Sequence, residues 1–173
     1  MESIIGCVRG LVLFTLIQTG DELADLLKRA QQIEDGFESV GQWEAYVRTK
    51  DPIFRRMIFH MLAESAKHKR MIGDLLRMVS VSDQSDIAPL SPARFDFSGK
   101  EQLEVMDELY QTEVLMRDTY TLIRESLPNI ELQTILLPGQ EEPFMKMLNE
   151  LVSDESSHAS MMSAHRGKVE RIR

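Results

Sequence analysis

The residues that could do chemistry in this chain are acidic and imidazole side chains on apolar helical faces. Residues three, four and seven apart share a face of an α-helix, because each residue turns the helix by about 100°. Glu113 lies in the middle of one apolar stripe, seven residues after Met106 and seven before Tyr120. Five more such side chains lie on apolar faces or at their edges: Glu34, Glu64, His68, Glu155 and His158.

A buried carboxylate without a partner costs several kcal/mol, so it must be protonated, paired with a positive charge or bound to a cation. Taken singly, each residue has an ordinary explanation. A lone inward histidine is usually hydrogen-bonded within the core, and a glutamate such as Glu113 can pair with Arg117 or a lysine. The six residues taken together are harder to explain in this way.

The depth of these residues along the helices supports a shared site. Because an α-helix rises equally per residue, distance in sequence from a turn gives depth. Glu34 precedes the first predicted turn by about as many residues as Glu64 and His68 follow it, and the second helix pair has the same symmetry. Each pair thus offers two carboxylates and one imidazole near mid-height. Such ligands suit two divalent ions of borderline hardness.

Four long predicted helices must position these side chains. Thr19 and Glu22 form a capping box that opens the first helix, which is expected to run to about residue 50. Asp51, followed by a proline, caps the second helix. The third helix is expected to open with a capping box at 98–101 and to end at Pro128, and the fourth to open at Pro143. Residues 129–142 are expected to be irregular or to hold a short extra turn.

The lengths of the connections predict the topology. Only a tight turn separates the first two helices, so they must be antiparallel neighbours. Residues 80–97 contain two prolines and several polar residues, which is typical of a long loop. A loop of about 18 residues can extend to roughly 60 Å, more than the length of one helix. We therefore expect an all-α four-helix bundle in which this loop crosses over and the second and third helices run parallel.

Composition narrows the classes of partner. The formal net charge of −8 argues against nucleic-acid binding, and an acidic surface favours solubility or gathers cations. The single cysteine, Cys7, cannot form an internal disulfide or a Cys-x-x-Cys metal site. This usage fits a reducing compartment, so we expect a cytoplasmic protein.

The chain divides into an apolar N-terminal segment, 1–20, and the helical bundle, 21–173. Residues 4–17 are strongly apolar, but they are too few to span a bilayer and they include Arg9. No basic residue precedes them, so a signal peptide is not indicated and no membrane partner is expected. The segment is expected to pack as a buried helix or as a contact between copies of the chain, and a homo-oligomer is predicted.

From Glu22 to His165 the chain resembles the ferritin-like superfamily, in particular the di-iron proteins of rubrerythrin and bacterioferritin type. That pattern places a glutamate on helices one and three, and Glu-x-x-His on helices two and four. The segment 155–158 matches the helix-four motif, and Glu34 and Glu113 match the single glutamates. The second helix departs from the pattern, because Ser65 stands where the family has glutamate. Glu64 either reaches inward, or points to solvent or pairs with Lys67 and leaves a five-ligand site.

The resemblance implies two iron ions as cofactor, with manganese or zinc as possible substitutes, and a reaction that oxidises Fe(II) or reduces dioxygen or peroxide. It therefore suggests a ferroxidase or peroxidase type of oxidoreductase, although whether the chain is an enzyme stays open. Without cysteine pairs there is no rubredoxin-type centre, so electrons come from an external donor or from the metal ions. Tyr110 and Tyr120 either hydrogen-bond to a ligand or pack as core tyrosines. The alternative is a ferritin-like bundle without redox activity that acts as a binding or interaction module.

Overall fold

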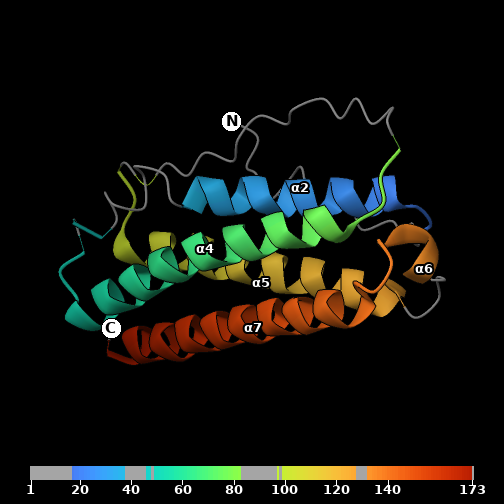
Figure 1. Cartoon of the computed structure of the whole chain (residues 1–173). Helices are drawn as coiled ribbons and strands as arrows, with labels where there is room; N and C mark the ends of the chain where they lie inside the picture. The colour runs from blue at the N-terminus through green and yellow to red at the C-terminus, as the bar shows by residue number, and fades with distance from the viewer. Residues whose placement is uncertain are drawn as a thin grey trace.

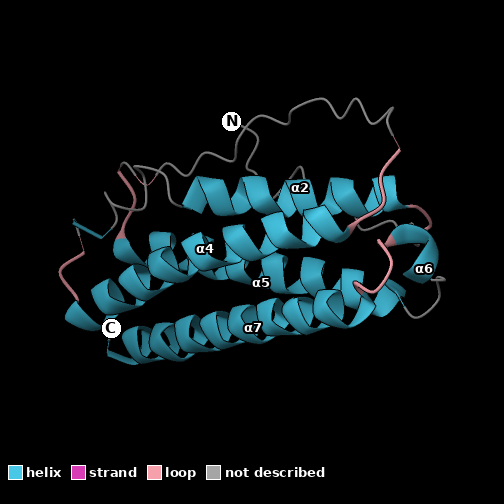
Figure 2. Ribbon diagram, in the orientation of Figure 1, coloured by secondary structure: helices cyan, strands magenta, loops and turns pink. Residues whose placement is uncertain are grey.

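The computed structural model is all-helical in the part of the chain that it describes, which confirms the predicted all-α class (Figures 1 and 2). The described helices are α2 (Gly20–Phe37), α4 (Pro52–Met78), α5 (Gln102–Ser126), α6 (Leu132–Ile135) and α7 (Glu141–Ile172). The predicted apolar segment lies outside the described residues except for its end. Described are residues 17–37, 46–47, 49–82, 97, 99–127 and 132–172, with side chains up to residue 166.

The four long helices lie alongside one another, and each packs against two others (Figure 1). α2 packs on α4, α5 packs on α7, and contacts of α4 with α7 and of α2 with α5 close the arrangement. The colours in Figure 1 show that α2 and α4 run in opposite directions, as do α5 and α7, while α4 and α5 run in the same direction. This arrangement surrounds a shared interior with four helical faces.

Two helices begin where their capping residues predict. The Thr19 hydroxyl accepts the Glu22 N–H at 3.2 Å, and the Glu22 carboxylate accepts the Thr19 N–H at 3.1 Å, which completes the capping box of α2. Asp51 Oδ1 accepts the N–H groups of Ile53 and Phe54 at 2.8 and 3.2 Å and caps α4. These side chains satisfy backbone donors that the first helical turn leaves without partners.

Two predicted helix starts were wrong. α5 begins after Glu101, whose N–H donates to the Glu104 carboxylate at 2.8 Å, rather than in a box at 98–101. Gly99 has a φ of 75°, a left-handed conformation that cannot belong to the helix. α7 begins at Glu141, two residues before the proline expected to open it. The first helix was expected to run to about residue 50: residues 46 and 47 are helical and 49 and 50 are not, while 38–45 lie outside the described part.

The short connection between α5 and α7 is hydrogen-bonded to the end of α4. The N–H of Leu137 donates to the carbonyl of Met78 at 2.8 Å, and the N–H of Ser80 donates to the carbonyl of Ile135 at 2.9 Å. The predicted short turn between the third and fourth helices is α6. The segment that follows α6 forms an antiparallel bridge with the segment after α4. These hydrogen bonds join α6 to the end of α4 at one end of the four long helices.

The core consists of two apolar clusters with a polar layer between them. Along α4, the members of one cluster are Phe54, Met57, Ile58, Met61 and Leu62. The other cluster includes Ile72, Leu75 and, just after the helix, Val79, so His68 falls between the two. Along α7, Leu151 belongs to one cluster and Met162 to the other, which places Glu155 and His158 in the same layer. Apolar packing above and below therefore excludes water from the layer that contains the predicted ligands.

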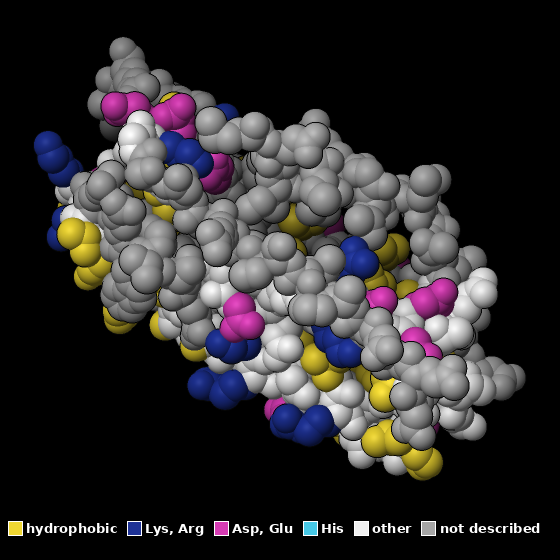
Figure 3. Space-filling view, turned by 90° about the horizontal axis from the view of Figure 1, so that it is seen from above, with side chains coloured by type: hydrophobic (Ala, Val, Ile, Leu, Met, Phe, Trp, Pro, Cys, Tyr) yellow, Lys and Arg dark blue, Asp and Glu magenta, His cyan; other side chains and the backbone are white. Residues whose placement is uncertain are grey.

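On the face shown in Figure 3, side chains of Lys and Arg and of Asp and Glu are interspersed rather than gathered by sign. Among the described residues, no helix is both long enough and apolar enough to cross a bilayer.

Candidate metal centre

The structure brings five of the six predicted ligands into one buried layer. They come from all four long helices and are each at most 4% exposed. They line a small internal cavity of about 10 Å³, whose remaining walls are Met61, Ser65 and Met116. The five are Glu34, His68, Glu113, Glu155 and His158.

The His68 imidazole of α4 lies between carboxylates on both of its nitrogen atoms. Its Nδ1 is 3.0 Å from Glu155 Oε1 and 3.4 Å from Glu34 Oε1, so this nitrogen faces the core. Its Nε2 is 3.3 Å from Oδ2 of Asp154, which in turn accepts a hydrogen bond from Lys67 Nζ at 2.9 Å. A carboxylate on one nitrogen fixes the ring and leaves the other nitrogen for a metal ion.

The His158 imidazole of α7 is arranged in the same way. Its Nδ1 is 2.9 Å from Glu113 Oε2 and 3.7 Å from Glu155 Oε2, and its Nε2 contacts Glu64 Oε2. Glu64 therefore meets the outward nitrogen of His158, away from the Nδ1 atoms, and its side chain is 26% exposed. The sixth predicted ligand thus lies at the edge of the layer instead of among the five buried residues.

The two histidine helices carry matching motifs. Glu64 stands four residues before His68 on α4, and Asp154 stands four residues before His158 on α7. Each of these acids contacts the outward nitrogen of the histidine on the other helix. The match fails at one position, because Ser65 replaces the equivalent of Glu155. Ser65 is buried, and its hydroxyl donates to Glu34 Oε2 at 2.5 Å.

Donor atoms in the buried layer form two groups of three that could each hold an ion. One consists of Glu34, His68 and Glu155, the other of Glu113, Glu155 and His158, and within each group the donor atoms all lie within 4.8 Å of one another. Glu155 belongs to both groups. Carboxylate and imidazole ligands suit divalent iron, manganese and zinc, so the donor set fits the pair of ions that the sequence resemblance implies.

The histidines of the layer are strongly basic. Burial alone would lower the pKa of His68, but hydrogen bonds with Glu155 and Glu34 outweigh it and raise this pKa to about 10. Burial would likewise lower the pKa of His158, yet hydrogen bonds with Glu113 and Glu155 raise it to about 11. Both rings are therefore imidazolium at neutral pH when no ion is bound.

The carboxylates of the layer differ in basicity. Burial would raise the pKa of Glu155, but hydrogen bonds with His158 and His68 lower it to about 2. For Glu34 and Glu113, burial prevails and raises the pKa above the ordinary range of a carboxyl group. The raised pKa values of the two histidines mean that a metal ion must displace protons from them to bind.

The structure shows the partners of several residues next to the site. Tyr120 is fully buried, and its hydroxyl donates to Glu34 Oε1 at 3.4 Å. This contact favours the interpretation that Tyr120 orients Glu34, whereas Tyr110 is only partly buried.

The charged neighbours pair differently from what the sequence suggested. Arg117 pairs with Asp118 and not with Glu113. Lys67 pairs with Glu150 and Asp154 and not with Glu64. An i, i+4 spacing to Glu64 was the only sequence signal for His60, which contacts it.

Comparisons with known proteins identify no relative. A scan of protein-family models, a search of curated proteins and a search of solved structures each found no match. Fold and site together define a chain that is helical throughout its described long elements and that carries buried groups of acidic and histidine side chains suited to metal ions.

Proposed function

We propose that the chain is a ferritin-like four-helix bundle, with a crossover between α4 and α5, that binds two divalent transition-metal ions in its core. The proposed ions are iron, and the proposed reaction is oxidation of Fe(II) or reduction of dioxygen or peroxide. One observation carries the proposal. The two carboxylate oxygens of Glu155 face two different imidazole nitrogens, with Oε1 3.0 Å from His68 Nδ1 and Oε2 3.7 Å from His158 Nδ1. A carboxylate in that position can bridge two ions.

The chain's own residues perform the tasks such a centre needs. Asp154 and Glu64 hold the outward nitrogens of the two histidines, so that both Nδ1 atoms stay directed inward. Tyr120 holds the Glu34 carboxylate through its hydroxyl. Apolar clusters on both sides keep water from the layer, which strengthens each charge interaction inside. Bound iron would supply the one-electron changes that reactions with dioxygen or peroxide require.

The test is an anaerobic loading of the protein with Fe(II), followed by exposure to dioxygen while loss of Fe(II) and consumption of oxygen are recorded. We expect the wild type to oxidise Fe(II) at least tenfold faster than protein-free buffer. Glu155→Gln, which removes the shared ligand, should fall to the buffer rate. Glu142→Gln is the control, because Glu142 is an exposed glutamate on the same helix. A wild-type rate equal to that of buffer would refute the redox function.

A second candidate function is a metal-free binding or interaction module, and Ser65 favours it. A serine at this position removes one carboxylate from the layer, and the remaining acids and histidines already pair with one another. This module would melt at the same temperature with and without Fe(II), Mn(II) or Zn(II). The metal-binding proposal predicts a rise instead, since an ion present at 100 times its Kd adds about 2.7 kcal/mol of stability.

A further inference from the structure

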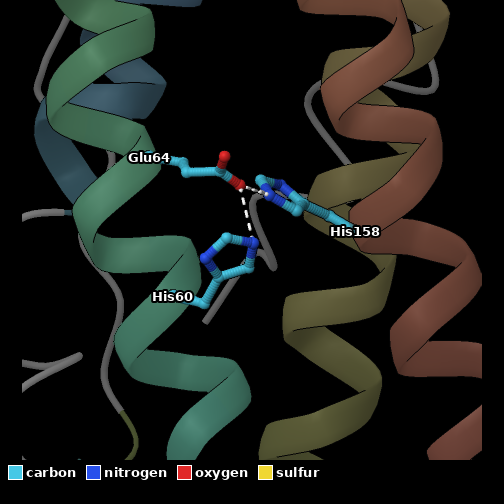
Figure 4. Close-up of side chains that lie close together, drawn as sticks. All are labelled: His60, Glu64 and His158. Carbon is cyan, nitrogen blue, oxygen red and sulfur yellow. Dashed lines mark hydrogen bonds and ion pairs between the residues drawn. The ribbon is translucent and has the colours of Figure 1, made fainter.

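A third group of donor atoms lies at the outer edge of the buried layer, and one of its members, His60, has no role in the core centre. His60 Nε2 is 3.1 Å from Glu64 Oε2, and His158 Nε2 contacts the same carboxylate oxygen (Figure 4). One donor atom from each of the three residues lies within 4.8 Å of the other two. The His60 side chain is 55% exposed and that of Glu64 is 26% exposed, so solvent reaches this group directly.

The backbone places these three donors together. His60 and Glu64 are four residues apart on α4 and so share one face of the helix, while His158 reaches toward them from α7. The His60 and His158 rings have centroids 5.7 Å apart and meet nearly at a right angle. Their nitrogens converge on the Glu64 carboxylate between them, as Figure 4 shows. Two imidazoles and one carboxylate are a donor set that binds zinc, iron or cobalt as divalent ions.

The inward side of His158 supplies a second, independent feature of a metal ligand. Its Nδ1 lies 2.9 Å from Glu113 Oε2, and Glu113 is buried. A metal-binding histidine commonly donates its other ring N–H to a carboxylate, which fixes the tautomer and the ring orientation. With Nδ1–H donating to Glu113, an ion that displaces the Nε2 proton meets a lone pair directed at the position between His60 and Glu64.

We propose that His60, Glu64 and Nε2 of His158 form an outer binding site for one divalent transition-metal ion, with water in the remaining coordination positions. The site is complete without the core centre, because it needs only the outward nitrogen of His158. A connection between the two sites rests on the function proposed above. When an ion in the core takes Nδ1, Nε2 can bind the outer ion only if His158 loses its second proton as well and bridges the two ions as an imidazolate. Occupancy of the core therefore changes the outer site through His158.

The experiment is a titration of metal-free protein with Co(II), read by visible absorption and by the number of ions bound. We expect His60→Ala to bind one equivalent less than the wild type. His60→Cys should restore that equivalent and add a thiolate-to-cobalt charge-transfer band in the near ultraviolet that the wild type lacks. Arg56→Ala, an exposed change one turn away on α4, should leave the titration unchanged. An undiminished stoichiometry in His60→Ala, or no new band in His60→Cys, would overturn the proposal.

A second variant separates failure of the outer site from failure of the core centre. Glu34→Gln changes a core ligand that has no contact with His60 or Glu64, so the outer site should keep its ion in this variant. If the core proposal fails and the outer site exists, the wild type and Glu34→Gln bind one ion each and His60→Ala binds none. If only the outer site fails, His60→Ala binds as many ions as the wild type.

Discussion

Ser65 is the residue at which this chain departs from the pattern it resembles, and its environment explains how the core tolerates the change. The hydroxyl donates to the Glu34 carboxylate at 2.5 Å and also contacts the Glu34 carbonyl at 3.2 Å. Serine thus provides a hydrogen-bond donor to Glu34 at the position where the pattern has a glutamate. The layer keeps three buried carboxylates, of Glu34, Glu113 and Glu155, beside its two imidazoles.

Ser65→Glu should reverse this departure. In metal-free protein the larger, acidic side chain has no free partner, and we expect it to lower the free energy of unfolding by about 2–4 kcal/mol. With Mn(II) or Fe(II) present, the added ligand should recover that loss and raise the melting temperature more than in the wild type. Ser65→Ala is the matched control, since it loses about 1 kcal/mol of hydrogen bonding and adds no ligand. Equal metal-induced shifts in both variants would show that position 65 does not face a metal ion.

The paired histidines also predict how stability depends on pH. Unfolded histidine has a pKa near 6.5, while the folded values are about 10 for His68 and about 11 for His158. The folded state therefore binds more protons than the unfolded state between these values, and stability falls as pH rises from 6.5 toward 10. Each fully linked proton contributes a slope of about 1.4 kcal/mol per pH unit.

Urea unfolding of chelator-treated protein across this pH range measures that slope. His68→Gln removes one of the two titrating groups, so its stability should fall less steeply with pH than that of the wild type. A wild-type stability that is constant or increases above pH 7 would contradict the pairing described here.

The sequence predicted the buried acidic and histidine side chains because charged residues interrupt apolar stripes of known period. It placed Glu34, His68, Glu113, Glu155 and His158 on inward faces, and the structure buries all five. It could not settle Glu64, because an i, i+4 pair on one helix shares a face without showing whether that face is core or edge. The contact of Glu64 with His158 depends on how α4 and α7 pack, and a single-helix pattern does not contain that information.

At the scale of the elements, the start of α2 packs so closely against the segment after α4 that one position has room only for glycine. A Cβ atom added to Gly20 would lie 1.8 Å from the carbonyl oxygen of Ser80, a distance that a backbone atom cannot accommodate without moving. Gly73 in the middle of α4 is different, because its nearest neighbour would be a side-chain atom at 3.7 Å.

These two glycines should respond to alanine in opposite directions. Gly20→Ala forces α2 and the segment after α4 apart, so we expect a loss of at least about 2 kcal/mol in the free energy of unfolding. Gly73→Ala should instead stabilise the protein by about 0.5–1 kcal/mol, because alanine favours the helix and meets no clash. Chemical denaturation followed by circular dichroism measures both. A neutral Gly20→Ala would contradict the close contact between these segments.

The helix starts show which local sequence signals were sufficient to predict where a helix begins. Side-chain caps at Thr19 and Asp51 were read correctly, since each is followed at once by an apolar helical pattern. The start of α5 was misplaced because the segment 98–101 has the residue types of a capping box. Because Gly99 has a left-handed conformation, the segment 98–101 cannot form a capping box. The box that forms is completed by Glu104, one turn later. Residue types alone do not distinguish two overlapping boxes.

At the scale of the whole molecule, the proposed function depends on four helices converging on one buried layer. Apolar clusters on both sides fix the depth of the layer, and each of the four long helices contributes at least one polar residue to it. The helical class followed from periodicity and composition. The pairing of Glu64 and Asp154 with histidines of the opposite helix could not be predicted in this way, because it depends on packing between helices that are distant in sequence.

The most direct test is anomalous X-ray scattering from crystals grown with Fe(II) under anaerobic conditions. Two anomalous peaks are expected in the buried layer, one beside His68 Nδ1 and one beside His158 Nδ1, with Glu155 bound to both. The absence of any peak between these histidines, or a single ion that Glu155 does not contact, would contradict the central claim.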